Sequence, residues 1–281
     1  MTTPKIGLSV LIPAHNEADE IAECLAAVFA SDPLPEPVTA EVLVLANGCK
    51  DDTAAIARDH PVPAPWQLRV IDIAQGGKLN ALNQGDAAAQ GGVLVYLDAD
   101  VRIETSLLSE LYALLNGDAP GYASGRPSVL GGQSAFSRAY GRLWERLPFV
   151  TQGVPGFGLF AMNSAGRNRW QSWPQIIADD TYARLMFAPN ERHIAAAGYR
   201  WPLVQGFRNL VRVRRRQNQG VEEIERLYPA LLDNDDKLSP SPSDVIRLFL
   251  GDPVGFLAYA AVSVAVKTPL FRSQNRWTRG R

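Results

Sequence analysis

Cysteine and histidine are scarce in this chain of 281 residues, which contains two cysteines and three histidines. The two cysteines, Cys24 and Cys49, cannot build a disulfide framework and match no metal-ligand spacing, so their number favours a reducing compartment. No two histidines stand at a ligand spacing either. This shortage excludes a fold held by disulfides and a Cys/His metal centre. The sequence also shows no Ser-His-Asp or Cys-His arrangement of the kind used by enzymes with a nucleophilic side chain.

We also expect neither a secretion signal nor a membrane-spanning segment. Residues 1–7 lack the basic and apolar regions of a secretion signal, so we expect the protein to be cytoplasmic. The apolar run Val254–Val266 is shorter than the ~20 residues that a spanning helix needs. The net charge is only −1, and no stacking aromatic motif accompanies the arginines between Arg200 and Arg216, which disfavours nucleic acid as a partner.

What the chain does have is enough apolar sequence for a full core, with 46% hydrophobic residues. In its first hundred residues, short apolar runs alternate with amphipathic segments. The runs predict strands at 8–12, 42–45, 68–73 and 93–97, and the segments predict helices at 16–30, 51–58 and 78–89. This alternation predicts an α/β fold with a doubly wound, mostly parallel, nucleotide-binding sheet.

Two carboxylates follow the last of these strands, in Asp98-Ala99-Asp100. Side chains two residues apart in an extended segment point the same way, so both acids would face one site at the carboxyl end of the strand. Two hard oxygen donors there suit a divalent cation that also holds the phosphates of a nucleotide. The alternative is a solvated turn, or acids that cap the helix expected near Thr105 and Ser106.

Polar segments follow the other predicted strands and should meet at the same sheet edge. They are Pro13–Glu17, Asn47–Asp52 and Gly77-Lys78. Taken alone, Lys78 could equally be an exposed lysine in the first turn of a helix.

These motifs occur in a fixed order: S-V-L-I-P-A-H-N-E, G-G-K-L-N-A-L-N-Q-G, L-D-A-D, I-A-D-D-T-Y and an arginine cluster that ends at Gly220. Over residues 8–220 the chain resembles the family 2 glycosyltransferases, inverting enzymes of the GT-A fold. The resemblance implies transfer of a sugar from a nucleotide diphosphate donor to a hydroxyl acceptor, either a glycan or a lipid-linked acceptor. It also implies a metal-dependent hexosyltransferase type of enzyme.

The resemblance further implies a donor site in the first half of the chain. The residues that would line the base and ribose pocket are Pro13, Ala14 and Glu17. Asn47 stands where many members have an acid that reads uracil, a departure that leaves the base undetermined.

By the same resemblance, Lys78 would contact the nucleotide or its pyrophosphate. Asp98 would hold the ribose or the metal, and Asp100 the metal, with Mn²⁺ or Mg²⁺ as the cofactor.

The second half would supply the acceptor side. The resemblance implies that Asp180 is the base and Asp179 its positioning neighbour; both acids could instead favour the start of a helix. Arg215 and Arg216 fall where members carry a pyrophosphate-binding arginine motif, although the usual Gln-x-x-Arg-Trp is absent. Without the resemblance, these arginines could form a solvated helix face or bind an anionic membrane surface.

Two other functions use a similar sheet. A nucleotidyltransferase should carry a glycine-rich loop with Arg or Lys directly after the first strand, whereas this chain has Pro13–Glu17 there. A non-catalytic sugar-nucleotide-binding protein would have lost the base, whereas Asp180 is present.

We expect a nucleotide-sugar-binding half at 1–115, an acceptor half of the same domain at 116–230, a linker at 231–243 and a helical tail at 244–281. A Gly-Asp-Pro break divides the tail, and basic residues follow it. The tail is either a helical pair packed on the catalytic domain or a peripheral attachment to the inner face of an anionic membrane.

Overall fold

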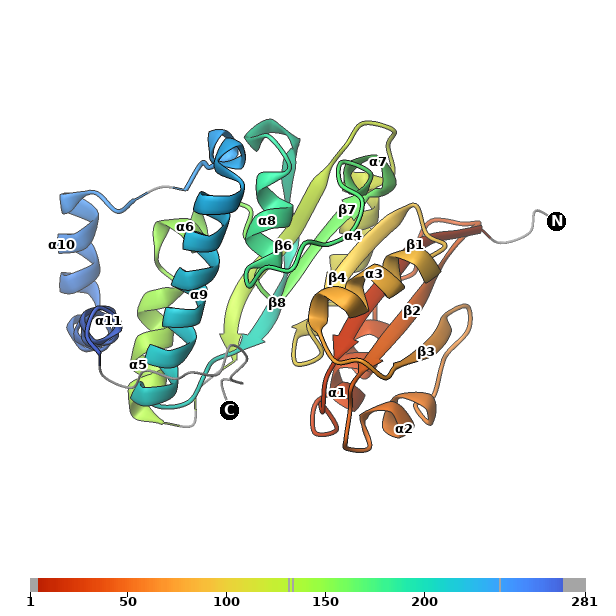
Figure 1. Cartoon of the computed structure of the whole chain (residues 1–281), viewed down its shortest axis with the longest axis horizontal. Coiled ribbons are helices and arrows are strands. Elements are labelled where there is room, and N and C mark those ends of the chain that lie inside the picture. The colour runs from red at the N-terminus through yellow and green to blue at the C-terminus, as the bar shows by residue number, and fades with distance from the viewer. Residues whose placement is uncertain (1–4, 131, 133, 238, 270–281) are drawn as a thin grey trace. The chain divides into compact units, whose positions relative to one another are not determined.

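The computed structural model describes residues 5–130, 132, 134–237 and 239–269 (Figure 1). The chain forms two compact units. The first contains the chain up to residue 126 together with residues 154–175 and 183–199. The second contains residues 127–153 and 176–182 and the chain from residue 200 onward.

A single eight-stranded sheet has the order β3-β2-β1-β4-β7-β6-β8-β5. Its strands are β1 (Lys5–Ala14), β2 (Val38–Asn47), β3 (Gln67–Ile73), β4 (Val93–Leu97), β5 (Arg102–Ile103), β6 (Tyr122–Leu130), β7 (Leu159–Asn163) and β8 (Arg192–Pro202). Strands β3, β2, β1 and β4 pair in parallel, and β7 pairs antiparallel with both β4 and β6. The mostly parallel sheet predicted for the first hundred residues is therefore confirmed.

The strand order reverses between β1 and β4. The chain runs outward from β1 through β2 to β3 and then returns to place β4 on the other side of β1. Ligands of open α/β sheets bind beyond the carboxyl ends of the strands at such a reversal. This topology therefore directs attention to the residues that follow Ala14 and Leu97.

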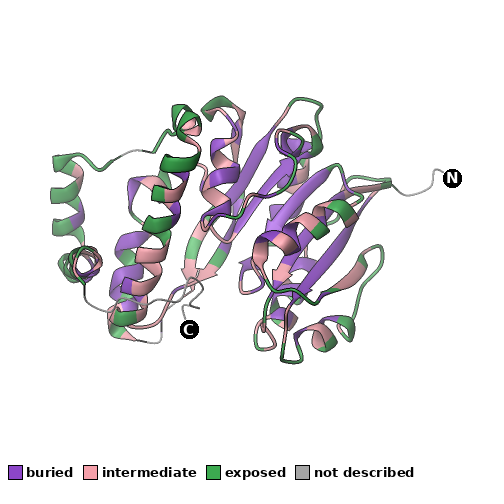
Figure 2. Ribbon diagram, viewed as in Figure 1, coloured by how far each residue is buried: buried purple, intermediate pink, exposed green. Residues whose placement is uncertain are grey.

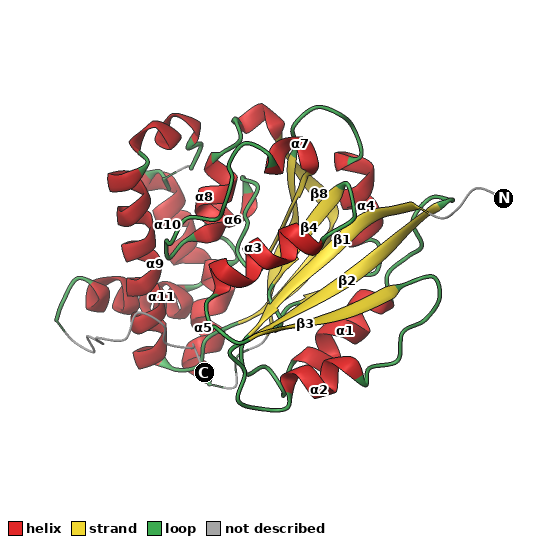
Figure 3. Cartoon of the chain, turned by 45° about the vertical axis from the view of Figure 1, so that its right-hand side comes forward, coloured by secondary structure: helices red, strands yellow, loops and turns green. Residues whose placement is uncertain are grey.

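Helices cover both faces of the parallel strands (Figure 3). Helix α3 (Lys78–Ala88) packs on β1 and β2, and α1 (Ile21–Phe29) and α2 (Thr53–Arg58) lie on the other face. The remaining helical elements that lie wholly in the first unit are α4 (Leu107–Leu115), α7 (Ser164–Arg167) and η1 (Pro189–Glu191). The five residues of β4 are all buried, as Figure 2 shows for most of the strands, so the apolar runs form the core.

The first predicted helix begins later than expected. Its periodicity is correct, because Ile21, Cys24, Leu25 and Val28 are buried. However, Asn16 has a φ of +53°, in the left-handed region, and the chain turns before entering α1 at Ile21. The predicted start at Asn16 was wrong because the loop after β1 takes a tight turn there.

The second unit is mainly helical. Its helices are α5 (Ala135–Trp144), α6 (Pro148–Thr151), α9 (Phe207–Leu227), η2 (Pro229–Asn234), α10 (Pro242–Gly251) and α11 (Pro253–Val266). The chain passes between the units within α8 (Asp179–Leu185), whose first turn carries Asp179 and Asp180. The predicted break at Gly251-Asp252-Pro253 separates α10 from α11, and the Asp252 side chain caps α11 by accepting from the Gly255 amide.

Helix α11 packs on α5 and α9. Its Tyr259 ring stacks on Tyr140 at a centroid distance of 5.4 Å. No helix among the described residues combines the length and apolarity that would let it span a membrane.

Candidate active site

A small open recess lies in the first unit at the reversal between β1 and β4. Its lining comes from the end of β1, the first turns of α3, the end of β4 and the loop that precedes β7. These residues include Pro13, Lys78, Leu82, Asp98, Gly156 and Gly158. Three residues predicted to bind the donor, Pro13, Lys78 and Asp98, therefore share one recess.

An ion pair lies at the recess. Lys78 is the first residue of α3, and its Nζ is 3.0 Å from Oδ1 of Asp98. Both side chains remain partly accessible, at 24% for Lys78 and 35% for Asp98. The positive end of the α3 dipole is directed to the same edge, so the recess combines a cation, a helix N-terminus and a carboxylate.

The two acids of Asp98-Ala99-Asp100 follow β4 in a turn. The backbone N–H of Asp98 donates to Gly158 O at 2.9 Å, and Asp98 O accepts from the Val101 amide at 3.1 Å. Both acids are half-buried. The residue at the cap of α4 is Ser106, so neither acid caps that helix.

Asn47 joins three of the predicted donor-binding segments. Its Nδ2 donates to Ala14 O at 2.8 Å, its Oδ1 accepts from the Gly77 amide at 3.1 Å, and its backbone O lies 2.6 Å from His15 Nδ1. A carboxylate could accept but could not donate to Ala14 O. Asn47 is only 3% exposed, so its side chain links the loops at this edge from the inside. The donated hydrogen bond explains why this position carries an amide and not an acid.

The loop containing Glu17 is held by residues that follow β2. The Glu17 amide donates to Thr53 Oγ1 at 2.7 Å, and the Ala18 amide donates to Asp51 Oδ2 at 3.2 Å. Burial alone would raise the pKa of Asp51, but hydrogen bonds from Thr53 and Ala18 bring that pKa below its usual value. The anionic Asp51 therefore helps to fix the loop at neutral pH.

Gly48 follows Asn47 and has a φ of +58°. A Cβ on Gly48 would lie 2.9 Å from the Cα of Gly76, so the loops after β2 and β3 approach backbone to backbone. Glycine at this position brings Gly77 and Lys78 within reach of Asn47.

A buried polar cluster behind the recess was not predicted from the sequence. Asp86 lies on α3 and accepts from the Tyr96 hydroxyl at 2.7 Å, from Arg167 Nε at 2.6 Å and from Trp173 Nε1 at 2.8 Å. Burial raises the pKa of Asp86 although Arg167, Tyr96 and Trp173 favour its charged form. Lys78, Leu82 and Asp86 stand four residues apart, so one face of α3 serves both the recess and this cluster.

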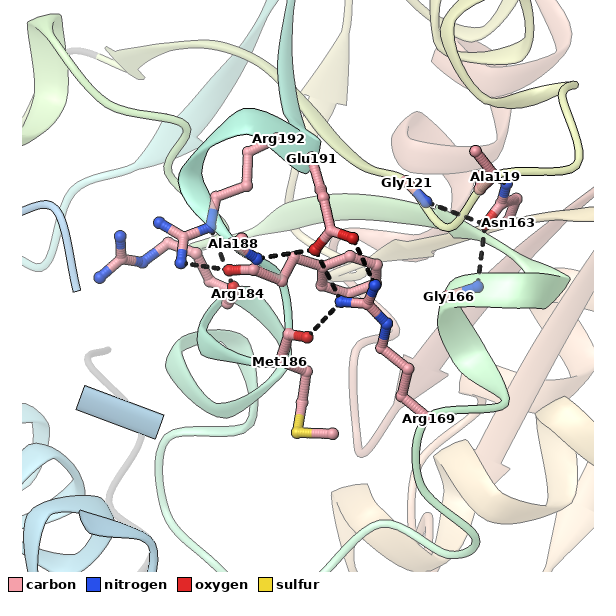
Figure 4. A network of polar contacts seen from close by, with 11 residues as sticks. Ala119, Gly121, Asn163, Gly166, Arg169, Arg184, Met186, Ala188, Glu191 and Arg192 are labelled. Carbon is pink, nitrogen blue, oxygen red and sulfur yellow. Dashed lines mark hydrogen bonds and ion pairs between the residues drawn. The ribbon is translucent and has the colours of Figure 1, made fainter. Parts of the chain in front are cut away.

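A second polar network holds the chain that follows α8 (Figure 4). Arg169 donates to Met186 O at 2.6 Å and pairs with Glu191, whose Oε2 accepts from the Ala188 amide at 2.8 Å. Arg192 donates to the carbonyl of Phe187 at 2.6 Å. Guanidinium groups therefore satisfy carbonyls at the carboxyl end of the helix that begins with the acid pair.

The acid pair itself belongs to the second unit. Asp179 is 5% exposed, whereas Asp180 is half-buried. The Thr181 amide donates to Asp180 Oδ1 at 2.7 Å. Of the two acids, Asp180 is therefore the one whose carboxylate is more accessible to an acceptor.

The arginines of α9, which also lie in the second unit, divide between different partners. Arg214 donates to the hydroxyls of Tyr140 and Tyr259 at 3.1 and 3.0 Å. Arg215 donates to the Ala265 and Val266 carbonyls at 2.8 and 3.1 Å and also to the Thr268 carbonyl. The predicted phosphate ligand Arg215 thus caps the carboxyl end of α11.

No group of three or more His, Cys, Asp or Glu side chains in the described part of the chain gathers where it could hold a metal ion. Of the two predicted metal ligands, Asp98 lines the recess, and Asp100 follows it two residues later and is half-buried.

Known structures share this architecture. Mannosyltransferase PcManGT from Pyrobaculum calidifontis, in complex with GDP-Man and Mn²⁺, has a TM-score of 0.55 and 20% identity, over 95% of this chain and 77% of that chain. TarS 1–349 of S. aureus, in complex with UDP, has a TM-score of 0.57 and 15% identity, over 94% of this chain and 76% of that chain. At such identities the likeness shows the fold, and the predicted GT-A fold with a helical C-terminal region is confirmed.

Relatives are found by sequence as well. Glycosyltransferase AglE of Haloferax volcanii is 38% identical over 100 residues, which cover 36% of this chain and 32% of that protein. Dolichyl-phosphate beta-glucosyltransferase of Drosophila melanogaster is 31% identical over 104 residues, covering 35% of this chain and 32% of that protein. The matches span about a third of the length of these curated relatives.

The sequence model of glycosyl transferase family 2 matches residues 9–181, from the first strand to the acid pair. This stretch is more than half of the chain and contains the recess, its ion pair and Asp179-Asp180. The chain therefore belongs to glycosyl transferase family 2.

Proposed function

We propose that this chain transfers a sugar, with inversion, from a nucleotide diphosphate donor to a hydroxyl acceptor. The observation that carries the proposal is the Lys78–Asp98 pair beside Asp100 at the reversal of the sheet. A lysine at a helix N-terminus suits a diphosphate. Proteins of the same fold support it, since PcManGT forms a complex with GDP-Man and Mn²⁺, and TarS 1–349 forms one with UDP-GlcNAc.

In the proposed reaction, Asp180 accepts the proton of the acceptor hydroxyl as its oxygen attacks the anomeric carbon. The bond from that carbon to the diphosphate breaks on the opposite face, so the configuration inverts. Lys78 holds the departing diphosphate. Asp179, which is buried beside Asp180, keeps the base in place.

Asp98 at the recess and Asp100, two residues later, fit a divalent cation. Asp98 and Asp100 offer two hard carboxylate groups, and Asp98 retains 35% exposure despite its pair with Lys78. Mg²⁺ commonly binds through one or two carboxylates plus substrate phosphates and water. When bound, Mn²⁺ or Mg²⁺ would neutralise charge on the leaving diphosphate.

For the pyrophosphate-binding arginine we favour Arg216 over Arg215. Arg215 already donates to carbonyls at the end of α11. Arg216 lies about 100° further around α9.

Donor hydrolysis by the purified protein tests the proposal. GDP-mannose, UDP-glucose and UDP-N-acetylglucosamine are incubated with the protein with and without Mn²⁺, and released nucleoside diphosphate is measured. Asp180→Asn should lower turnover ~10²–10⁴-fold without changing diphosphate affinity. A protein that binds these donors but hydrolyses none would instead be a binding module, and equal rates in Mn²⁺ and in chelator would refute metal assistance.

We also propose that the enzyme docks on an anionic membrane through α10 and α11. Four large apolar side chains of α10 are exposed, and on α11 Val254, Leu257 and Val264 are 63–65% exposed. Most of α10 is coloured as exposed in Figure 2. Exposed Lys267 follows α11, and the sequence continues with basic residues, which suit anionic headgroups.

Sedimentation with anionic liposomes at low salt tests this docking. Leu250→Glu combined with Leu257→Glu should leave the protein in the supernatant, because these side chains are 71% and 63% exposed and contribute little to packing. Leu114→Glu, at a 40% exposed leucine of α4, is the matched control and should not change binding. Wild-type protein that fails to sediment would refute the proposal.

A further inference from the structure

The segment that enters α8 lies along the second half of α9, and both belong to the second unit. The Ile177 amide donates to Glu223 Oε2 at 2.8 Å. Five residues later, the Tyr182 ring meets Tyr228 edge-on at a centroid distance of 5.1 Å. The acid pair lies between these two contacts, at Asp179 and Asp180.

Between the contacts, α9 approaches the segment so closely that only glycine fits. A Cβ built on Gly220 would lie 2.8 Å from the Cβ of Ala178 and 3.1 Å from its amide nitrogen. Glycine within a helix of 21 residues weakens that helix relative to alanine, so its presence calls for a local reason. The close approach to Ala178, the residue directly before Asp179, supplies that reason.

We infer that helix α9 holds the segment of residues 176–182, which carries the acid pair, in place. In this arrangement Gly220 and Glu223 are positioning residues for Asp180. This rests on the proposed role of Asp180 as the base. Gly220 sets how close the segment lies to the helix, and Glu223 fixes the backbone at Ile177. A base must lie within hydrogen-bond reach of the proton it takes, so a displacement of the segment reaches the chemistry directly.

The same face of α9 includes a predicted phosphate ligand. Arg216, Gly220 and Glu223 are spaced four and three residues apart, which places them along one side of the helix. Arg216 lies one turn, or about 6 Å, before Gly220. A single rigid helix therefore sets the spacing between the base segment and this arginine.

Three substitutions and two control substitutions test this inference. Glu223→Ala removes the acceptor for Ile177, and Gly220→Ala forces the helix and Ala178 apart. Glu222→Ala and Asn218→Ala are matched controls, since both residues are exposed on the same helix. Glu223→Gln keeps an acceptor oxygen for the Ile177 amide and should therefore retain the turnover that Glu223→Ala loses.

Turnover in donor hydrolysis and GDP or UDP affinity with Mn²⁺ are measured, together with amide hydrogen exchange of residues 176–182. We expect Gly220→Ala and Glu223→Ala to lower kcat about 10–100-fold with diphosphate affinity unchanged. Exchange of residues 176–182 should rise in both, while Glu223→Gln and the controls stay within twofold of wild type in kcat.

The inference is overturned if amide exchange of residues 176–182 is unchanged in both Gly220→Ala and Glu223→Ala. It is also overturned if exchange rises while kcat stays unchanged. An equal loss in the matched controls also overturns it. If the wild-type protein hydrolyses no donor, the proposed function fails. The exchange measurements alone then decide whether α9 fixes residues 176–182. If Asp180→Asn retains full turnover, the assignment of Asp180 as the base fails. Gly220 and Glu223 are then not positioning residues for a base.

Discussion

Replacing Asp86 by alanine should destabilise the protein more than any exposed ion-pair substitution. Asp86 accepts from the Tyr96 hydroxyl, from Arg167 and from Trp173 at 2.6–2.8 Å. Arg167 is only 8% exposed, so the alanine variant would leave a buried guanidinium without this carboxylate. Breaking a buried pair in this way costs about 3–5 kcal/mol.

The raised pKa of Asp86 adds a second, sharper expectation. Its pKa is raised because burial outweighs the combined attraction of Arg167 and of the hydrogen bonds from Tyr96 and Trp173. The intact pair is therefore worth much less to the folded state than the loss of one partner costs. The double variant Asp86→Leu/Arg167→Met should accordingly recover part of the stability that Asp86→Ala loses, while the Tyr96 hydroxyl and Trp173 Nε1 still lack their acceptor.

Urea unfolding followed by fluorescence measures both effects, with Asp72→Ala as the control. Asp72 pairs with Arg58 on the surface, where the side chains are 65% and 46% exposed, and such pairs contribute about 0–1 kcal/mol. In thermal unfolding the Asp86→Ala loss corresponds to a fall in Tm of roughly 6–20 °C. A loss below about 1 kcal/mol, or a double variant as unstable as Asp86→Ala, would contradict this account of the cluster.

Three further predictions concern the recess and its supports. Lys78→Met should weaken nucleoside diphosphate binding roughly 10–100-fold by calorimetry, since a charge-assisted contact contributes about 1.5–3 kcal/mol; unchanged affinity would remove Lys78 from the site. Asn47→Asp replaces a donor by an acceptor facing a carbonyl and should cost about 1–3 kcal/mol in urea unfolding, so a neutral result would refute its bracing role. Hydrogen bonds from Arg169 lower the pKa of Glu191 below its usual 4.5, so Glu191 stabilises the fold at neutral pH and loses this effect as the pH falls through the lowered pKa. The difference in unfolding free energy between wild type and Glu191→Gln should therefore shrink as the pH falls below 4.5, and a pH-independent difference would count against the ion pair.

The parallel strands and the sheet edge that carries the recess were predictable because their signals are local. Continuous apolar runs such as Val93–Leu97 become fully buried strands, and the polar residues that follow them must meet at one edge. The helix start at Asn16 was missed because a left-handed turn leaves no periodicity signal. The residues that line the recess from the loop before β7, Gly156 and Gly158, lie far along the chain and carry no strand-end pattern.

The polar supports were not predictable for a different reason. Asp86 looks like one more polar residue on a helix, and its partner Arg167 lies 81 residues away. Asn47 was noticed only as a departure from an acid, because its bonds to Ala14 and Gly77 depend on how three loops pack. Such roles are set by tertiary contacts, which no spacing within one segment reveals.

The arginine cluster of α9 illustrates how helical geometry divides a charge run. In the sequence, Arg214, Arg215 and Arg216 form one basic block. On a helix, successive residues point about 100° apart, so Arg214 and Arg215 reach α11 while Arg216 falls on the side of Gly220. A block that seemed to have one function therefore combines a structural role with a proposed catalytic one.

Helical geometry also makes the two interpretations of the C-terminal helices compatible. These interpretations are packing on the rest of the protein and attachment to a membrane surface. Helix α11 is apolar on all sides, a pattern that requires burial of more than one face. One stripe, Gly255, Ala258, Val262 and Ala265, is buried, and Arg215 holds the carboxyl end of the helix. A neighbouring stripe of Val254, Leu257 and Val264 stays exposed. Packing on α5 and α9 explains the first stripe but not the second. The proposed membrane docking is therefore compatible with this packing, because the two use different sides of one helix.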